Sequence, residues 1–184
     1  MKFPFKYQTV LICIGIFIFA FWLGEYAEDN ELIKRFIASY GYVGIFIIAI
    51  ISGFNLAVPV PAISFLPLFL GAGLNIWITI VLITLGVTLA DMIAFLLGRA
   101  GRYVIKEGKM IKRLERMRDK NPHFPIFFVF LFASFVPLPN EVLGLPMGFM
   151  GYNRWAVFCA FLFGNFVFNT LYGFGVVNLF NFIQ

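Results

Sequence analysis

The chain has 184 residues, of which 61% are hydrophobic and only 12% are charged, and 26 of them are phenylalanine. Ordinary soluble domains are about 45–50% apolar. The composition and the mean hydropathy of +0.93 therefore exclude a water-soluble core and indicate one integral membrane domain. The formal net charge of +5 raises the question of a nucleic-acid partner, which the position of the charges answers below.

A helix that crosses the hydrocarbon layer needs about 20 mainly apolar residues. The segments 7–24, 76–98 and 155–178 meet this requirement. No cleavage site of the signal-peptide type follows the first one, so we expect it to be a retained N-terminal anchor helix. Acidic residues come next, and the segment 29–39 then has the pattern of a short amphipathic helix that lies in the membrane interface.

Two further apolar segments, 41–74 and 124–151, are interrupted near their centres by proline pairs. The pairs are Pro59 with Pro61 and Pro137 with Pro139. Because proline lacks the N–H group and clashes with the preceding helical turn, Pro-x-Pro favours an extended bend. Each half is too short to span the bilayer comfortably. We therefore predict two re-entrant hairpins with the prolines at their tips.

The two halves of the chain repeat each other at a constant offset of 78 residues without a gap. The matched pairs are Phe54 with Phe132, Val58 with Val136, Pro59 with Pro137, Pro61 with Pro139, Gly73 with Gly151, Asn75 with Asn153, Trp77 with Trp155 and Gly86 with Gly164. Each repeat thus contains a re-entrant hairpin, a Gly-x-Asn-x-Trp turn and a spanning helix. The predicted fold is an all-α integral membrane protein with an internal repeat.

The positive charge is concentrated in the segment 99–122. From Arg99 to Lys120, nine basic side chains accompany three acidic ones, a net charge of +6. Cytoplasmic loops of membrane proteins collect Lys and Arg. A topology signal therefore explains the charge better than a nucleic-acid partner does, and we expect no nucleic acid to bind.

Charge also predicts the orientation. With Lys2 and Lys6 in the cytoplasm, the first helix runs outward, the segment 76–98 returns inward, and the last helix leaves Gln184 outside. The two repeats are then inverted relative to each other, which is the architecture of many secondary transporters. We expect a prokaryotic plasma membrane protein with its N-terminus in the cytoplasm.

Asp91 and Glu141 are the two carboxylates within apolar segments. An ionised carboxylate in hydrocarbon costs about 2.5–3.5 kcal/mol, so such residues usually face an interior cavity. Burial disfavours the charged form, which would suit proton-linked movement. The alternative is structural, since Glu141 follows Asn140 where a half-helix begins and can cap free N–H groups there.

Polar residues recur along one face of each later spanning helix. Thr88 and Asp91 share a face in the segment 76–98, as do Asn165 and Asn169 in the segment 155–178. The repeat aligns Asp91 with Asn169. The two polar faces either line one interior path or provide hydrogen bonds between the helices.

Irregular backbone at membrane depth is tolerated where it is buried in protein or borders water, so the tips predict a hydrated central site. Arg99, Arg102 and Arg154 flank the apolar segments and are candidates for contacts with lipid headgroups. No Ser-His-Asp set, metal-ligand cluster, P-loop or dinucleotide fingerprint is present. We therefore expect no enzyme, no cofactor and no bound metal.

The combined pattern resembles the DedA family, also called the VTT or SNARE-associated Golgi protein family. The resemblance covers residues 40–178. It rests on Pro59-x-Pro61 followed by Leu70-Gly71-Ala72-Gly73, on Asp91 with the helix end Leu97-Gly98-Arg99-Ala100-Gly101, and on the second hairpin followed by Gly148, Gly151 and Trp155.

The resemblance implies two opposed re-entrant hairpins and the transport or scrambling of phospholipids or polyprenyl phosphates, with proton coupling in some members. Many relatives carry arginines in the second hairpin, where this sequence has Glu141 and no arginine. This difference favours a zwitterionic lipid, a cation or a proton-linked solute as cargo.

Three hypotheses follow from the sequence. In the first, the protein moves membrane lipids between leaflets, with protons as a further partner. The second is proton-coupled export of a cation or small solute, and the third is a structural factor that assembles other membrane proteins. A homo-oligomer is compatible with each of the three.

Overall fold

The computed structural model describes residues 31–54, 61–104, 116, 119 and 121–183, and they form helices without a strand. The helices in chain order are α2 (Glu31–Gly53), the short 3-10 helix η1 (Ala62–Phe65), α3 (Leu66–Gly71), α4 (Ile76–Val104), α6 (His123–Phe135), α7 (Glu141–Phe149) and α8 (Arg154–Ile183). The predicted anchor helix 7–24 and the tip residue Pro59 lie outside the described residues.

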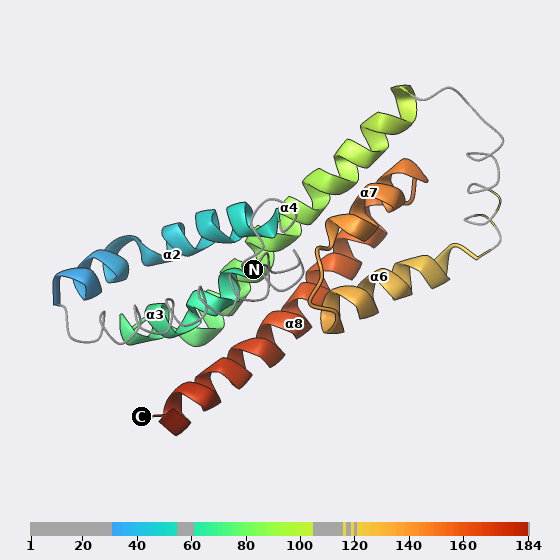
Figure 1. Ribbon diagram of the computed structural model, residues 1–184. Helices are drawn as coiled ribbons and strands as arrows, with labels where there is room; N and C mark the ends of the chain where they lie inside the picture. Colours follow the sequence, from blue (N-terminus) through green and yellow to red (C-terminus); the bar gives the residue numbers. More distant parts are fainter. Residues whose placement is uncertain (1–30, 55–60, 105–115, 117–118, 120, 184) are drawn as a thin grey trace, which may run out of the picture.

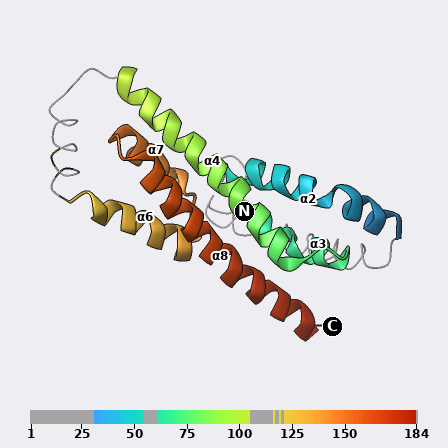
Figure 2. The ribbon, with the colours of Figure 1, turned by 180° about the vertical axis from the view of Figure 1, so that it is seen from behind.

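Two long helices, α4 and α8, form the centre of the molecule. They run side by side in opposite directions, with α2 and α3 at one end and α6 and α7 at the other (Figures 1 and 2). Both contain stretches long and apolar enough to cross a membrane, Ile76–Arg102 and Arg154–Gly175. Side chains at their ends fix the antiparallel arrangement, because Trp77 at the start of α4 packs edge-on against Phe174 late in α8 at 5.4 Å.

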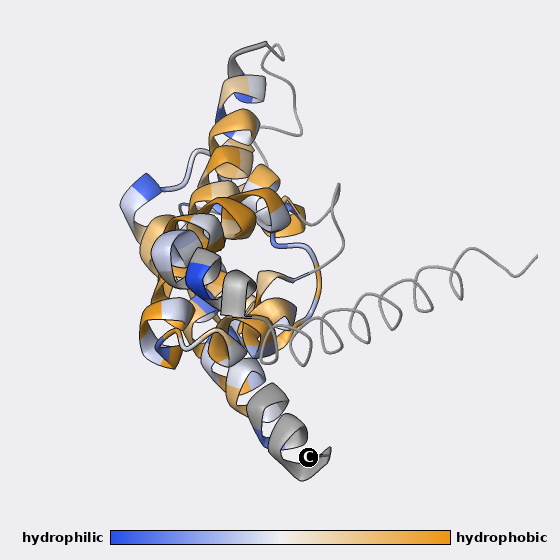
Figure 3. Ribbon diagram, turned by 90° about the vertical axis from the view of Figure 1, so that its left-hand side faces the viewer, coloured by the Kyte–Doolittle hydropathy of each residue, from blue (hydrophilic) through white to orange (hydrophobic). Residues whose placement is uncertain are grey.

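The outward-facing side chains along the middle of α4 are apolar, and the polar residues in this part of the helix are buried. Val81, Leu85 and Leu89 are exposed, whereas Thr84, Thr88 and Asp91 are at most 2% exposed. Figure 3 shows apolar residues over most of the described helices. Water would disfavour such a surface and hydrocarbon would favour it, so the distribution fits a helix with lipid outside and a polar interior.

Small residues allow α4 to approach two neighbours closely. Gly86, Ala90, Ala94 and Gly98 recur at every fourth position along one face. The first two contact α2, where a Cβ added to Gly86 would lie 2.5 Å from Cβ of Ala49. Further along, the same face meets α7. Helices in membranes commonly associate through such small-residue contacts.

The tightest contact in this interface lies between α7 and α4. A Cβ added to Gly148 would overlap the carbonyl oxygen of Phe95, and one added to Gly98 would overlap that of Leu145. Both overlaps are with backbone, which cannot move aside as a side chain would. Glycine at both positions therefore sets the distance between α7 and α4.

The segment that joins α3 to α4 has the same local structure as the segment that joins α7 to α8, 78 residues later. Gly73 and Gly151 have positive φ angles of 83° and 73°, and each ends the preceding helix in a Schellman motif. The bonds Leu74 N–H to Phe69 O and Tyr152 N–H to Met147 O are equivalent in the two motifs.

The helices that follow also begin in the same way. The side-chain oxygen of Asn75 accepts a hydrogen bond from the N–H of Trp77 at 2.9 Å, and that of Asn153 accepts one from Trp155 at 2.8 Å. This is N-capping by asparagine. The matched Asn and Trp residues thus have the same local role in both halves of the chain.

Helix boundaries differ from the sequence-based ranges at several places. A single helix, α2, runs through residue 40, where the sequence analysis divides an amphipathic helix from a hairpin arm. The single Gly41 costs about 1 kcal/mol relative to alanine and does not end a helix as proline does. Likewise, α4 continues beyond residue 98 to Val104 and includes the first residues of the basic segment.

A prediction follows from the contact between α7 and α4. Gly148→Ala should destabilise the protein by about 1–3 kcal/mol, because the added methyl group forces two backbones apart. Gly175→Ala is the matched control within a helix, since no atom of the described residues lies within 4 Å of its added Cβ. Thermal unfolding in detergent measures both, and equal Tm values for the two variants would contradict the close approach.

Candidate functional site

A proline-containing segment separates α6 from α7. Helix α6 ends at Phe135, and Val136 is extended with φ −105° and ψ 115°. The N–H of Leu138 donates to the carbonyl of Val136 at 2.8 Å, which makes a tight turn around Pro137. Helix α7 then begins at Glu141. The described part of the first proline pair is similar, since Pro61 is extended and directly precedes η1.

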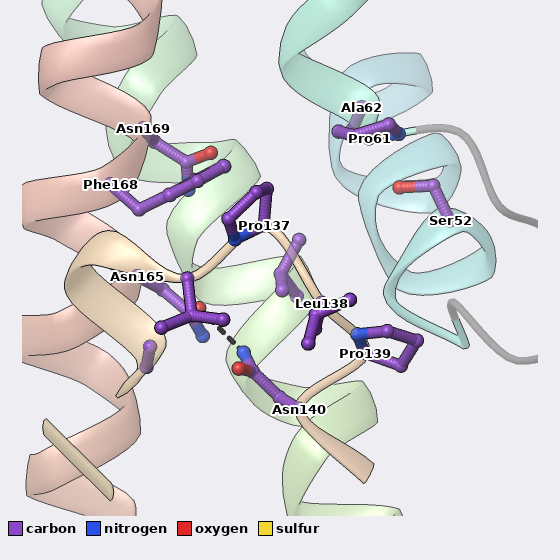
Figure 4. A pocket seen from close by; sticks show the side chains of 13 residues that line it. Ser52, Pro61, Ala62, Pro137, Leu138, Pro139, Asn140, Asn165, Phe168 and Asn169 are labelled. Atoms are coloured by element: carbon purple, nitrogen blue, oxygen red, sulfur yellow. Dashed lines mark hydrogen bonds between the residues drawn. The ribbon is translucent and has the colours of Figure 1, made fainter. Parts of the chain in front are cut away.

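These two proline segments border one cavity of about 320 Å³. Pro61 and Ala62 come from the first, and the residues from Val136 to Asn140 come from the second. Figure 4 shows the second segment between Asn165, Phe168 and Asn169 of α8 and the group formed by Ser52, Pro61 and Ala62. Segments far apart in the sequence therefore meet at this cavity.

A hydrogen-bonded group of polar side chains lies beside the cavity. Asn140 donates to Asp91 Oδ2 and to Asn165 Oδ1, both at 3.0 Å. Asn165 donates to Asp91 Oδ2 at 2.8 Å and to Thr88 Oγ1 at 3.1 Å. We call Thr88, Asp91, Asn140 and Asn165 the Asp91 network. It joins α4, the start of α7 and α8.

The Asp91 network is buried near the middle of both candidate membrane spans. Asp91 is 0% exposed and Asn165 is 3% exposed. Both lie close to the midpoints of the spans Ile76–Arg102 and Arg154–Gly175. The second oxygen, Asp91 Oδ1, is buried and accepts no hydrogen bond from the described residues. A carboxylate in this position is costly unless its neighbours compensate it.

Two more predicted residues lie next to the network. Asn169 is buried, lines the cavity and donates to Thr84 Oγ1 at 3.2 Å. Glu141 is 3% exposed in the first turn of α7, but it is not among the residues that line the cavity. The preceding Asn140 makes no capping bond with its side chain, because its amide is turned toward Asp91.

The predicted headgroup residues lie away from this cavity, at one end of the helix pair. Arg99 near the end of α4 and Arg154 at the start of α8 border a common hollow. The guanidinium of Arg154 lies 5.7 Å from the ring centre of Trp155, a cation–π distance. Arg102 is half-buried one helical turn beyond Arg99 and does not border that hollow.

Sequence reasoning did not single out Ser52 and Phe168, which also line the cavity. Phe168 stacks on Tyr172 at 5.7 Å. Its position three residues after Asn165 places it on the same helical face, so the spacing alone could have identified it. Ser52 has no such signal, because its place depends on how α2 packs against α4. Among the described residues, no cluster of His, Cys, Asp and Glu could hold a metal ion.

The contact between Asp91 and Asn165 yields a prediction. Asn165→Asp should destabilise the protein because it places a second carboxylate beside Asp91 and removes two N–H donors. Adding Asp91→Asn to that variant exchanges the two side chains, so that one amide again faces one carboxylate. We expect the free energy of unfolding of the double variant to be about 0.5–3 kcal/mol higher than the sum of the two single-variant effects predicts.

Thermal unfolding of the two single variants and the double variant in detergent measures this coupling. Thr79→Val is the control, because the Thr79 hydroxyl is buried in the same helix and has no hydrogen-bond partner among the described residues. Additive Tm changes would mean that Asp91 and Asn165 do not interact in the folded protein.

Comparison with known families identifies the chain. A family model described as the VTT domain matches residues 58–178, a range that contains both proline pairs, the Asp91 network and most of the cavity lining. No curated protein and no solved structure gives a significant match. The matched range covers well over half of the chain, so this protein belongs to the VTT domain family, the DedA or SNARE-associated Golgi family of membrane proteins.

Proposed function

We propose that the protein moves lipids between the leaflets of a membrane, as a transporter or scramblase, through the cavity between its two proline segments. The family is associated with membrane transport or lipid handling and is generally not classed as enzymatic. The observation that carries the proposal is the cavity itself, which lies beside a buried polar network near the middle of two apolar helices.

The proposed architecture is an inverted pair of re-entrant hairpins. Helices α6 and α7 have 13 and 9 residues, which at 1.5 Å per residue is too short to cross about 30 Å of hydrocarbon. The equivalent segments before α4 and α8 have matching turns, and those two helices run in opposite directions. These features support hairpins that enter from opposite sides and meet near the midplane, as in many transporters.

The size and lining of the cavity suit a lipid headgroup. Pockets for small ligands occupy about 300–1,000 Å³ and combine apolar walls with a few polar groups. The cavity of about 320 Å³ has proline, valine, leucine and phenylalanine walls with three asparagines and a serine. A headgroup would occupy this cavity while its acyl chains remain in the bilayer. The asparagines would replace part of the water that the headgroup loses.

The membrane orientation is part of the proposal. Arg99 and Arg154 lie at the same end of the helix pair, and Arg99 is the first residue of the basic segment 99–122. The positive-inside rule assigns that end to the cytoplasm. There the arginines would contact anionic headgroups, at about 1 kcal/mol each. Trp77 and Trp155 lie at opposite ends of the pair, as expected for residues at the two interfaces.

A second candidate function is proton-coupled export of a small cationic solute. Two observations favour it, the buried Asp91, whose Oδ1 accepts no hydrogen bond from the described residues, and a cavity of about 320 Å³, at the lower end of the range for small-ligand pockets. In that case Asp91 Oδ1 is the atom where a proton would be exchanged for the cation. Liposome assays of lipid movement and of proton flux distinguish the two candidates.

Reconstitution into liposomes with tail-labelled fluorescent lipids tests the proposed function. The protein should make inner-leaflet label accessible to an added membrane-impermeant quencher. Asp91→Asn should slow this step about tenfold, equivalent to about 1.4 kcal/mol in the barrier. Thr79→Val, on the same helix and outside the cavity lining, should keep the rate of the parent protein.

Glu141→Gln separates a site residue from a structural one in the same assay. If the role of Glu141 is structural, the substitution lowers Tm and leaves the rate of lipid movement per folded molecule unaltered. If Glu141 belongs to the site, the substitution lowers that rate. If inner-leaflet label stays protected with the parent protein for all lipids tried, lipid movement is the wrong function.

A further inference from the structure

The orientation of the amide groups beside the cavity determines which chemical groups the cavity can bind. Asn140 and Asn165 each carry two N–H donors and one acceptor oxygen. Both N–H groups of Asn140 are used, toward Asp91 Oδ2 and Asn165 Oδ1. Both N–H groups of Asn165 are used as well, toward Asp91 Oδ2 and Thr88. Neither residue has an N–H left for a ligand.

Asp91 fixes this orientation. Its Oδ2 accepts hydrogen bonds from the amides of both Asn140 and Asn165, so both amides turn their N–H groups toward it. The carbonyl oxygens consequently point away from the carboxylate. The oxygen of Asn165 accepts from Asn140. Asn140 lines the cavity, and its N–H groups are turned to the network, so its oxygen is the side-chain atom left for a ligand. Asn169, which also lines the cavity, uses an N–H for Thr84 and leaves its own oxygen.

The charges around the cavity point to the same conclusion. None of its described lining residues is charged. The sequence contains no Lys or Arg between Arg35 and Arg99, none between Lys120 and Arg154, and none after Arg154. The buried carboxylates Asp91 and Glu141 lie on α4 and α7 instead. An unesterified phosphate would therefore find no cation among the described lining residues, and the side-chain N–H groups of Asn140 and Asn165 are already used.

We infer that the cavity binds a headgroup through hydrogen bonds that the headgroup donates, with a primary ammonium as the best match. Asp91 acts as a positioning residue that turns the amide oxygens toward this group. A primary ammonium brings three N–H donors, which match the acceptor oxygens, and its positive charge meets no Lys or Arg among the described lining residues. This inference rests on the proposed function, because it names the class of lipid that the same cavity would take.

Three short-chain lipids separate the alternatives in a binding assay on the full chain in detergent. Phosphatidylethanolamine has N–H donors, phosphatidylcholine has the same charge without N–H donors, and phosphatidic acid has a phosphate without an ammonium. Apparent Kd values come from the rise in Tm with lipid concentration. We expect phosphatidylethanolamine to bind about tenfold more tightly than either of the others, the equivalent of one well-made hydrogen bond.

Two variants test the assigned roles. Asp91→Asn supplies an N–H group where the network needs an acceptor. Asn140 and Asn165 can then turn their N–H groups away from position 91. The preference for phosphatidylethanolamine over phosphatidylcholine should therefore disappear. Asn169→Leu removes a cavity oxygen without touching the Asp91 network and should weaken phosphatidylethanolamine binding only. Thr79→Val should behave as the parent protein, and a variant that does not fold leaves the three-lipid comparison on the parent protein decisive.

Failure of this inference is distinct from failure of the proposed function. Equal binding of the three lipids, or tighter binding of phosphatidic acid, overturns the ammonium preference even if liposome assays show lipid movement. Preferential binding of phosphatidylethanolamine supports the inference even if no labelled lipid moves. In that case the proposed function fails and the ammonium preference stands. Equal binding of phosphatidylethanolamine and phosphatidylcholine overturns the role of the N–H donors.

Discussion

Asp91 is a buried carboxylate on a helix whose outward-facing side is apolar, and the amides of Asn140 and Asn165 both donate to one of its oxygens. A buried carboxylate requires such donors, because leaving it unsolvated in an apolar medium costs several kcal/mol. The two donors come from the start of α7 and from α8. The need to solvate one side chain thereby fixes where α7 begins and how α8 lies against α4.

Close helix packing makes this arrangement possible. Asn140 reaches Asp91 because α7 lies against α4 at the distance that Gly148 and Gly98 permit. A larger residue at either position would separate the two helices and lengthen the bonds to Asp91. The proline segment before α7 also contributes, since it places Asn140 at a helix start inside the protein. The glycines, the prolines and the amides consequently form one structural unit around the cavity.

Several features follow from the sequence for reasons that do not depend on the rest of the fold. Pro137 and Pro139 lie two residues apart and interrupt the helix between α6 and α7, whereas the single Pro146 lies within α7. Asn75 and Asn153 cap helices through bonds to residues two positions away. The apolar stretches in α4 and α8 are recognisable from their length alone. Periodicity also placed Thr88 with Asp91 and Asn165 with Asn169 on common faces. Local geometry was sufficient for each of these predictions.

Other features depended on the tertiary structure, because they involve residues far apart in the chain. The sequence by itself determined the helical membrane class, the proline breaks, the repeated turns and the polar faces, since each results from bonds or spacing within a few residues. Only the packing of α7 and α8 against α4 decided that Asn140 solvates Asp91 instead of capping its own helix. The same packing decided that the cavity presents amide oxygens, because the direction of an amide is set by the partner it meets.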